Sequence, residues 1–170
     1  TSVNGLAGPA NDGGFGNLLL NAGTINATGS GNVISMTTIN FRTETAMTLN
    51  VNSGADLDIQ SKIVNSSGSS SGLTKSGAGL LKLSGANTYT GPTTVNAGTL
   101  QLYGGGGLLY PYTGTVSIAA GATLRNSSSA NFQMNGALSG SVTLQTDTDA
   151  TAYTVVSAAS TFTGPISLSR

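Results

Sequence analysis

The chain contains no cysteine, no histidine and no tryptophan. Zinc sites built on thiolate or imidazole, haem ligation, thiol nucleophiles and Ser-His or Cys-His triads are therefore excluded. Charged residues are also scarce, at 7% of the chain, and Lys+Arg 6 balances Asp+Glu 6. Such a chain has little electrostatic attraction to nucleic acid or to anionic membranes. We expect no cofactor, no metal and no nucleic-acid partner.

Long hydrophobic runs are absent too, and the run at 18–20 is as long as any in the chain. We therefore expect no insertion of this segment into a membrane. The chain opens at Thr1 without an apolar leader. We expect residues 1–170 to be one domain, taken from a longer protein.

Small residues dominate the composition of the chain. Gly, Ser, Thr and Asn together make up half of it. Leu, Ile, Val and Phe are too few for a core of large side chains. The balanced charge nevertheless argues against disorder, which usually needs self-repulsion. The composition favours a fold in which the polar groups of the backbone pair with one another in hydrogen bonds around a thin aliphatic interior.

Apolar residues alternate with polar ones in short runs that end at glycine turns, as at 49–51, 57–59, 116–118 and 124. This alternation predicts short β-strands, and no segment has the spacing of an α-helix. Turn glycines recur at intervals in the low twenties, for example from Gly98 to Gly121. A period of that size predicts an all-β parallel β-helix, or β-solenoid, of about seven coils.

A longer internal repeat supports this interpretation. The sequence Ala-Asn-Thr-Tyr-Thr-Gly-Pro at 86–92 returns as Ala-Ser-Thr-Phe-Thr-Gly-Pro at 159–165. The offset between the two copies corresponds to about three coils of the predicted solenoid. We expect residues 159–170 to be a truncated second copy of a unit at 72–102.

Residues 72–102 resemble the autotransporter-associated β-strand repeat, also called the passenger-associated transport repeat. The resemblance is carried by Gly-Leu-Thr-Lys-x-Gly-x-Gly at 72–79, Leu-Ser-Gly-x-Asn-Thr-Tyr-Thr-Gly at 83–91 and Val-Asn-Ala-Gly-Thr-Leu at 95–100. It implies a right-handed parallel β-helix in a secreted or surface-displayed protein of a Gram-negative bacterium. It also implies export through an outer-membrane β-barrel translocator, which the repeat is thought to aid. The family has no catalytic residues to transfer.

Two pairs of carboxylates offer an enzymatic alternative, a polysaccharide lyase or hydrolase. The side chains of Asp56 and Asp58 extend from one face of a strand. Asp147 and Asp149 repeat that spacing, and calcium is the ion that this second pair would bind. The sequence shows neither aromatic platforms that would bind a sugar nor a second acid suitable for hydrolysis. Too few oxygen ligands for calcium lie near 147–149. We interpret both pairs as solvated charges and expect no enzyme.

An aromatic and aliphatic cluster breaks the strand pattern. Its members are Tyr103, Leu108, Leu109, Tyr110 and Tyr112. One interpretation is a contact surface for a glycan or a partner, which makes the chain an adhesin. The other, which we favour, is a loop that folds back over the side of the solenoid.

The leading hypothesis is a rigid structural segment, a stalk or a fibre subunit. Open solenoid ends are templates for pairing with another chain, so copies could stack head to tail. The residues expected at such contacts are Leu18, Leu20, Ile25, Ile166 and Leu168. Threonine-rich solenoid faces can also bind ice, but no regular Thr-x-Thr rank is evident at one position of every coil, and we do not expect that activity.

Overall fold

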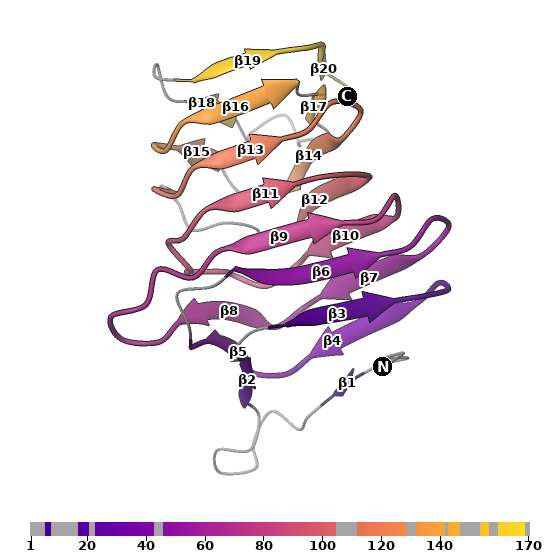
Figure 1. The fold of residues 1–170 in the computed structure, drawn as a ribbon, viewed down its shortest axis with the longest axis vertical. Coiled ribbons are helices and arrows are strands. Elements are labelled where there is room, and N and C mark those ends of the chain that lie inside the picture. Colours follow the sequence, from indigo (N-terminus) through magenta and orange to yellow (C-terminus); the bar gives the residue numbers. More distant parts are fainter. Residues whose placement is uncertain are drawn as a thin grey trace.

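The computed structural model describes residues 6–7, 17–20, 23–42, 46–104, 112–128, 132–141, 143–146, 154–156 and 160–168. Regular structure in this part of the chain consists of short strands, and their ladder pairings are parallel. Most partners come from successive coils, stacked from the N-terminal to the C-terminal end of the molecule (Figure 1). No helix among these residues could cross a membrane.

The front sheet, which faces the viewer in Figure 1, has seven strands in chain order. They are β3 (Thr24–Ala27), β6 (Met47–Val51), β9 (Leu73–Ser76), β11 (Thr93–Val95), β13 (Val116–Ile118), β16 (Leu138–Ser141) and β19 (Thr161–Thr163). Front-sheet partners lie one coil apart in the sequence. Thr48 is the partner of Thr74, and Thr74 is in turn the partner of Thr94, which follows it more closely in the sequence. Coil length therefore varies while the register is kept.

The back sheet has eight strands, again in chain order. They are β1 (Leu6–Ala7), β4 (Asn32–Ser35), β7 (Asp56–Ile59), β10 (Leu80–Leu83), β12 (Thr99–Gly104), β14 (Thr123–Ser128), β17 (Thr143–Thr146) and β20 (Ile166–Leu168). Tight turns join β6 to β7, β9 to β10, β11 to β12 and β13 to β14. Glycines 54, 77, 98 and 121 occupy these turns with φ between 69° and 79°, a conformation that L-residues with a Cβ rarely adopt.

The third side of the solenoid is only partly sheet. Near the N-terminal end it holds β2 (Asn17–Leu20), β5 (Thr38–Phe41) and β8 (Lys62–Asn65), and towards the C-terminal end β15 (Phe132–Met134) and β18 (Thr154–Val156). Between them no strand is assigned among residues 84–92.

The predicted all-β parallel β-solenoid is confirmed. About five turns are present, slightly fewer than the seven coils predicted. The end layers explain the difference, because strands such as β1 and β20 extend a sheet without belonging to a turn described on all of its sides.

The two related heptapeptides do not occupy the same side of a coil. Residues 86–92 lie on the third side, whereas Thr161–Thr163 forms β19 in the front sheet. Their similarity in sequence is therefore not matched by equivalent positions. A Thr-x-Thr-Gly-Pro segment suits any corner at which a strand-like stretch ends in a turn.

The core is a thin seam of aliphatic columns between the sheets. In the back sheet, Leu57, Leu81, Leu100 and Leu124 are in register and at most 1% exposed. Each coil contributes only a few such side chains. The seam explains how a chain poor in large apolar residues buries enough surface to fold.

Backbones approach closely in a column of glycines at one corner. A Cβ built on Gly114 would overlap the carbonyl oxygen of Gly91, and one on Gly136 would overlap the carbonyl oxygen of Gly114. Gly91 is similarly placed over the carbonyl of Ser70. These positions need glycine because of space between coils, since their φ angles are not positive.

Lys75 is a charged side chain within one of the inward-facing columns. It is in register with Ile25, Leu49, Val95 and Ile118 of the other coils, and its exposed fraction is 0%. Its Nζ donates hydrogen bonds to the carbonyl oxygens of Ser76 (3.0 Å), Gly77 (2.6 Å) and Ala97 (3.0 Å). The first two acceptors belong to its own turn and the third to the turn of the next coil. The ammonium group therefore ties two successive turns together.

Burial lowers the pKa of Lys75 from 10.5 to about 8 because removing the ammonium group from water disfavours its charged form. Between about pH 8 and pH 10 the unfolded chain consequently holds more protons at this position than the folded chain. The free energy of unfolding should therefore rise with pH, by less than about 1.4 kcal/mol per pH unit for one group.

We predict this rise in the wild type and its loss in Lys75→Met. Urea unfolding followed by circular dichroism at pH 7.0 and pH 9.0 measures it, because the tyrosines of the unfolded chain, with a pKa of about 10, are still largely protonated at both values. Lys62→Met is the matched control, because Lys62 is exposed, and it should keep the wild-type rise. Equal pH dependence in the wild type and Lys75→Met would contradict the prediction.

Candidate functional site

The predicted contact cluster is divided by the structure. Tyr103 lies on β12 with its side chain 45% exposed. The Nζ of Lys82, from the neighbouring strand β10, lies 4.3 Å from the centroid of the Tyr103 ring, an attractive cation–π contact. One face of the ring is therefore occupied by a side chain of the protein itself. Leu108, Leu109 and Tyr110 lie outside the described residues.

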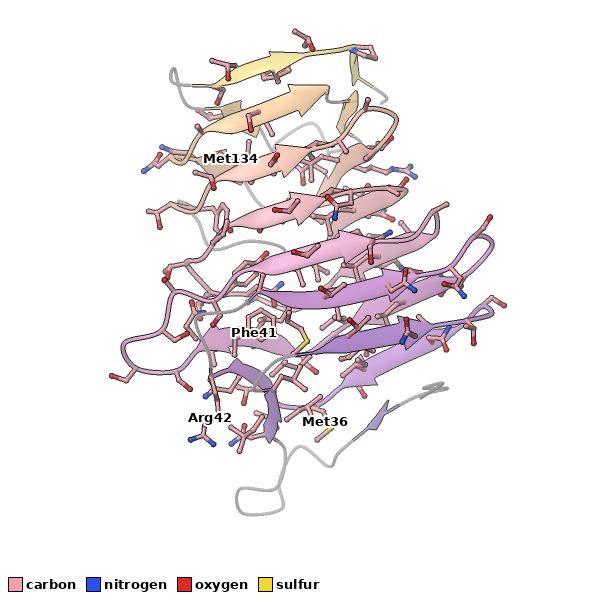
Figure 2. The ribbon with its side chains drawn as sticks, in the orientation of Figure 1. Met36, Phe41, Arg42 and Met134 are labelled. Carbon is pink, nitrogen blue, oxygen red and sulfur yellow. The ribbon has the colours of Figure 1, made fainter. Side chains whose placement is uncertain are left out.

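Tyr112 is not at the surface, so the contact-surface interpretation of the cluster does not apply to this residue. It is 1% exposed and packs edge-on against Tyr89 at 5.8 Å between ring centroids, and Tyr89 packs against Phe41 at 5.9 Å. Met134, which is also buried, is the register partner of Tyr112 in the next coil through a parallel backbone bridge. Figure 2 shows Phe41 and Met134 on the same side of the stack, several layers apart.

The hydroxyl groups in this column bond to one another. Thr93 Oγ1 lies 2.7 Å from Tyr89 Oη and 2.8 Å from Tyr112 Oη, and Tyr112 donates to the carbonyl oxygen of Gly91. Burial raises the pKa of Tyr112 to about 12 and the pKa of Tyr89 well above 10. Both phenols stay protonated near neutral pH, so they hold the third side together rather than acting as acids or bases.

Side chains replace the missing strand on the third side of coil 73–95. The backbone N–H of Ile63 donates to Asn87 Oδ1 at 2.8 Å, and the N–H of Thr90 donates to Asn65 Oδ1 at 2.7 Å. Asn87 is 1% exposed. The segment is thus held to the preceding coil by these asparagine side chains, together with the backbone hydrogen bond from the N–H of Thr88 to the carbonyl oxygen of Ile63 at 2.8 Å.

The carboxylates of Asp56 and Asp58 bond to neighbouring residues on the outer face of β7. Asp56 Oδ1 accepts from the N–H of Gly31 at 3.0 Å, and Asp58 accepts from Ser84 at 2.6 Å and Gln60 at 3.2 Å. Asp147 and Asp149 lie outside the described residues. Within the part of the chain that the structure describes, no group of three or more metal-ligating side chains forms. The geometry of Asp56 and Asp58 supports a structural role.

The residues expected at stacking contacts lie in terminal strands. Leu18 and Leu20 are in β2, Ile25 is in β3, and Ile166 and Leu168 are in β20, each the last strand of its sheet. Leu18, Leu20 and Ile25 are partly buried and pack against the core. Among the residues that the structure describes, each of these strands pairs with one neighbour. Self-association through them remains a prediction.

Sequence reasoning missed Lys75 and Thr93 as buried polar residues. A signal was present, because Lys75 has the same strand parity as the inward Leu73. The positions of its acceptors on two turns could not be known without the coil register. The repeat therefore contributes buried hydrogen-bonding side chains rather than a surface site.

Comparison with protein families gives one match that coincides with this segment. Residues 73–102 match the family model described as the passenger-associated-transport-repeat. The comparison with curated proteins gave no match, and the comparison with solved structures gave none. The matched residues include Lys75, Asn87, Tyr89 and Thr93, whose buried contacts are given above. The resemblance of residues 72–102 to this repeat is therefore confirmed over residues 73–102.

Proposed function

We propose that this chain is a non-catalytic structural segment of an autotransporter passenger, displayed at the cell surface of a Gram-negative bacterium. The repeat at 73–102 aids export of the passenger through an outer-membrane β-barrel translocator. The observation that carries the proposal is that the repeat matched by the family model lies within the solenoid stack and directs polar side chains inward. Lys75 donates a hydrogen bond to the carbonyl oxygen of Ala97 in the turn of the next coil. Asn87 accepts one from the backbone N–H of Ile63 in the preceding coil.

A solenoid suits vectorial export because each coil contacts only its neighbours. Coils that emerge first can fold without waiting for the rest of the chain. Folding outside the cell then disfavours backward movement of the passenger. The repeat contributes by adding buried hydrogen bonds between coils where one side has no sheet.

We predict that Gly91→Ala reduces surface display more than Gly136→Ala. Both substitutions place a methyl group against a backbone carbonyl of the preceding coil, so each should destabilise the fold by about 1–3 kcal/mol. Only Gly91 lies inside the matched repeat. The chain is fused to an outer-membrane translocator in a Gram-negative host. Protease accessibility on intact cells measures display, and urea unfolding compares the two stability losses.

Equal display losses at matched stability would show that general stability matters rather than the repeat. Unchanged display in Gly91→Ala, despite lost stability, would remove the proposed role of the repeat in export.

The structural role we infer is that of a rigid stalk whose copies also stack head to tail. Support comes from the parallel register of both large sheets and from terminal strands such as β3 and β20, each of which pairs on one edge within the described part of the chain. A parallel sheet edge is a template for another parallel strand. Contacts of this kind do not close on themselves, so they give open filaments.

Negative-stain electron microscopy of the purified chain tests this role. We predict short rods that join end to end into filaments as concentration rises. Leu18→Asp, in the terminal strand β2, should shorten the filaments, whereas Ser117→Asp on an internal strand should not. Compact particles of constant size at every concentration would contradict stacking.

An adhesin that binds glycans through residues 103–112 is the alternative function. The observation in its favour is the exposed Tyr103 ring, which keeps one face free of Lys82. On a glycan array we predict that the Tyr103→Ala variant loses any binding of the wild type, because aromatic faces carry sugar contacts. Signals that are the same for both proteins would rule out Tyr103 as the contact.

A further inference from the structure

The outer face of the front sheet carries one hydroxyl residue at the same position of every strand. The strand registers place these seven residues in a single line across the sheet. We call this line the hydroxyl rank. Its members, from the N-terminal layer to the C-terminal layer, are Thr24, Thr48, Thr74, Thr94, Ser117, Ser139 and Thr161.

The hydroxyl rank is a single column of hydroxyl residues. It leaves the expectation of no regular Thr-x-Thr rank in place, because the residue two places after a rank member is Asn26, Ser76 or Ala119 in different coils. Its members are not evenly spaced in the sequence, since the step from Thr48 to Thr74 is longer than the step from Thr74 to Thr94. A search at a fixed period therefore misses it. The rank becomes visible only when the strands are aligned by their hydrogen bonds.

None of the seven hydroxyl groups makes a hydrogen bond within the part of the molecule that is described. The neighbouring column behaves differently. Asn50 donates to Asn26 at 2.9 Å and accepts from Ser76 at 3.4 Å, so those side chains bond to each other along the stack. The rank hydroxyls are exposed or partly exposed and directed away from the core. Their hydrogen-bonding capacity is available to something outside the protein.

The face around the rank is uncharged and lacks aromatic rings. The outward side chains described on the front strands are Thr, Ser and Asn, whereas the back sheet carries Asp56, Asp58, Lys82 and Arg125. Figure 2 shows the short oxygen-tipped side chains along the front strands. A neutral face does not attract anionic polymers or membranes, and a face without aromatics lacks the platforms on which sugars stack.

The spacing of the hydroxyls is fixed by the sheet. Neighbouring strands lie about 4.8 Å apart, and residues i and i+2 on one face lie about 6.6 Å apart along a strand. Thr24 and Asn26, or Thr48 and Asn50, are pairs of this kind. The result is a regular row of hydroxyl groups, flanked at these two strands by asparagine amides. Water oxygens at the surface of ice also form a regular array on this length scale.

We propose that the outer face of the front sheet binds ice. The threonine hydroxyls would take the places of lattice waters, and their methyl groups would lie against the spaces between them. A rigid array positions the groups in advance, so little conformational entropy is lost on binding. This activity goes beyond the structural and export roles proposed above and does not depend on them.

The test uses the whole chain and ice grown from buffered water as the probe. Thermal hysteresis, inhibition of ice recrystallisation and partition into a growing ice hemisphere are measured for three proteins. These are the wild type, the rank variant Thr74→Lys/Thr94→Lys, and the control variant Thr99→Lys/Thr123→Lys. The control residues are partly exposed register partners on β12 and β14 of the back sheet, and they receive the same added charge.

We expect the wild type and the control variant to enter ice and slow recrystallisation, and the rank variant to lose both effects. Circular dichroism checks that each variant folds. If the rank variant does not fold, Thr94→Val, which keeps the side-chain shape without the hydroxyl, should still weaken both effects.

Exclusion of the wild type from ice would overturn the proposal. Equal loss in the rank and control variants would also overturn it, because the effect would then come from charge rather than from this face. A wild type that is excluded from ice but retained on insoluble cellulose would also overturn the proposal, and it would assign the face to polysaccharide binding.

Discussion

The constraint on which this molecule depends is the register between one coil and the next. Every strand of the two large sheets takes its backbone hydrogen bonds from strands one coil away in the sequence, so a coil has no fold of its own. The corners must then approach as closely as the strands do. Where they do so, at Gly91, Gly114 and Gly136, no side chain fits between the layers. The aliphatic columns, the buried hydrogen bonds and the regular outer faces all follow from this repeated contact.

Much of the fold could be predicted because its signals are local. Alternation at 49–51 and 57–59 fixes which residues face inward, and turn glycines such as Gly54 and Gly98 separate the strands. The contacts between coils are not local. The parity of Lys75 places it inward, but the acceptor on Ala97 comes from the next coil, 22 residues away. The sequence neighbours of Tyr112 suggest a surface cluster, whereas its partners Tyr89 and Phe41 belong to earlier coils.

The core shows how a chain with few large apolar residues can pack its interior and still provide hydrogen-bond partners for the polar side chains that it buries. Thr93 occupies an inward position that holds Leu73 and Val116 in the adjacent coils. Lys75 occupies an inward position that holds Leu49 and Val95 in the adjacent coils. An unpaired polar group there would cost about 1–3 kcal/mol. Tyrosine hydroxyls complete the hydrogen bonds of Thr93, and three carbonyl oxygens complete those of Lys75. These polar positions coincide with the family repeat, which is consistent with a segment selected for how its coils join.

The unequal coil lengths have a consequence for how such a protein can change. The coil from Thr48 to Thr74 is longer than the coil from Thr74 to Thr94, yet both front-sheet registers are continuous. Part of the longer coil is the serine- and glycine-rich stretch 66–72 on the third side. That side can therefore accept inserted residues without shifting the two large sheets. A lineage of such proteins could acquire or discard projecting loops there, and so vary what it presents, while the supporting stack remains unchanged.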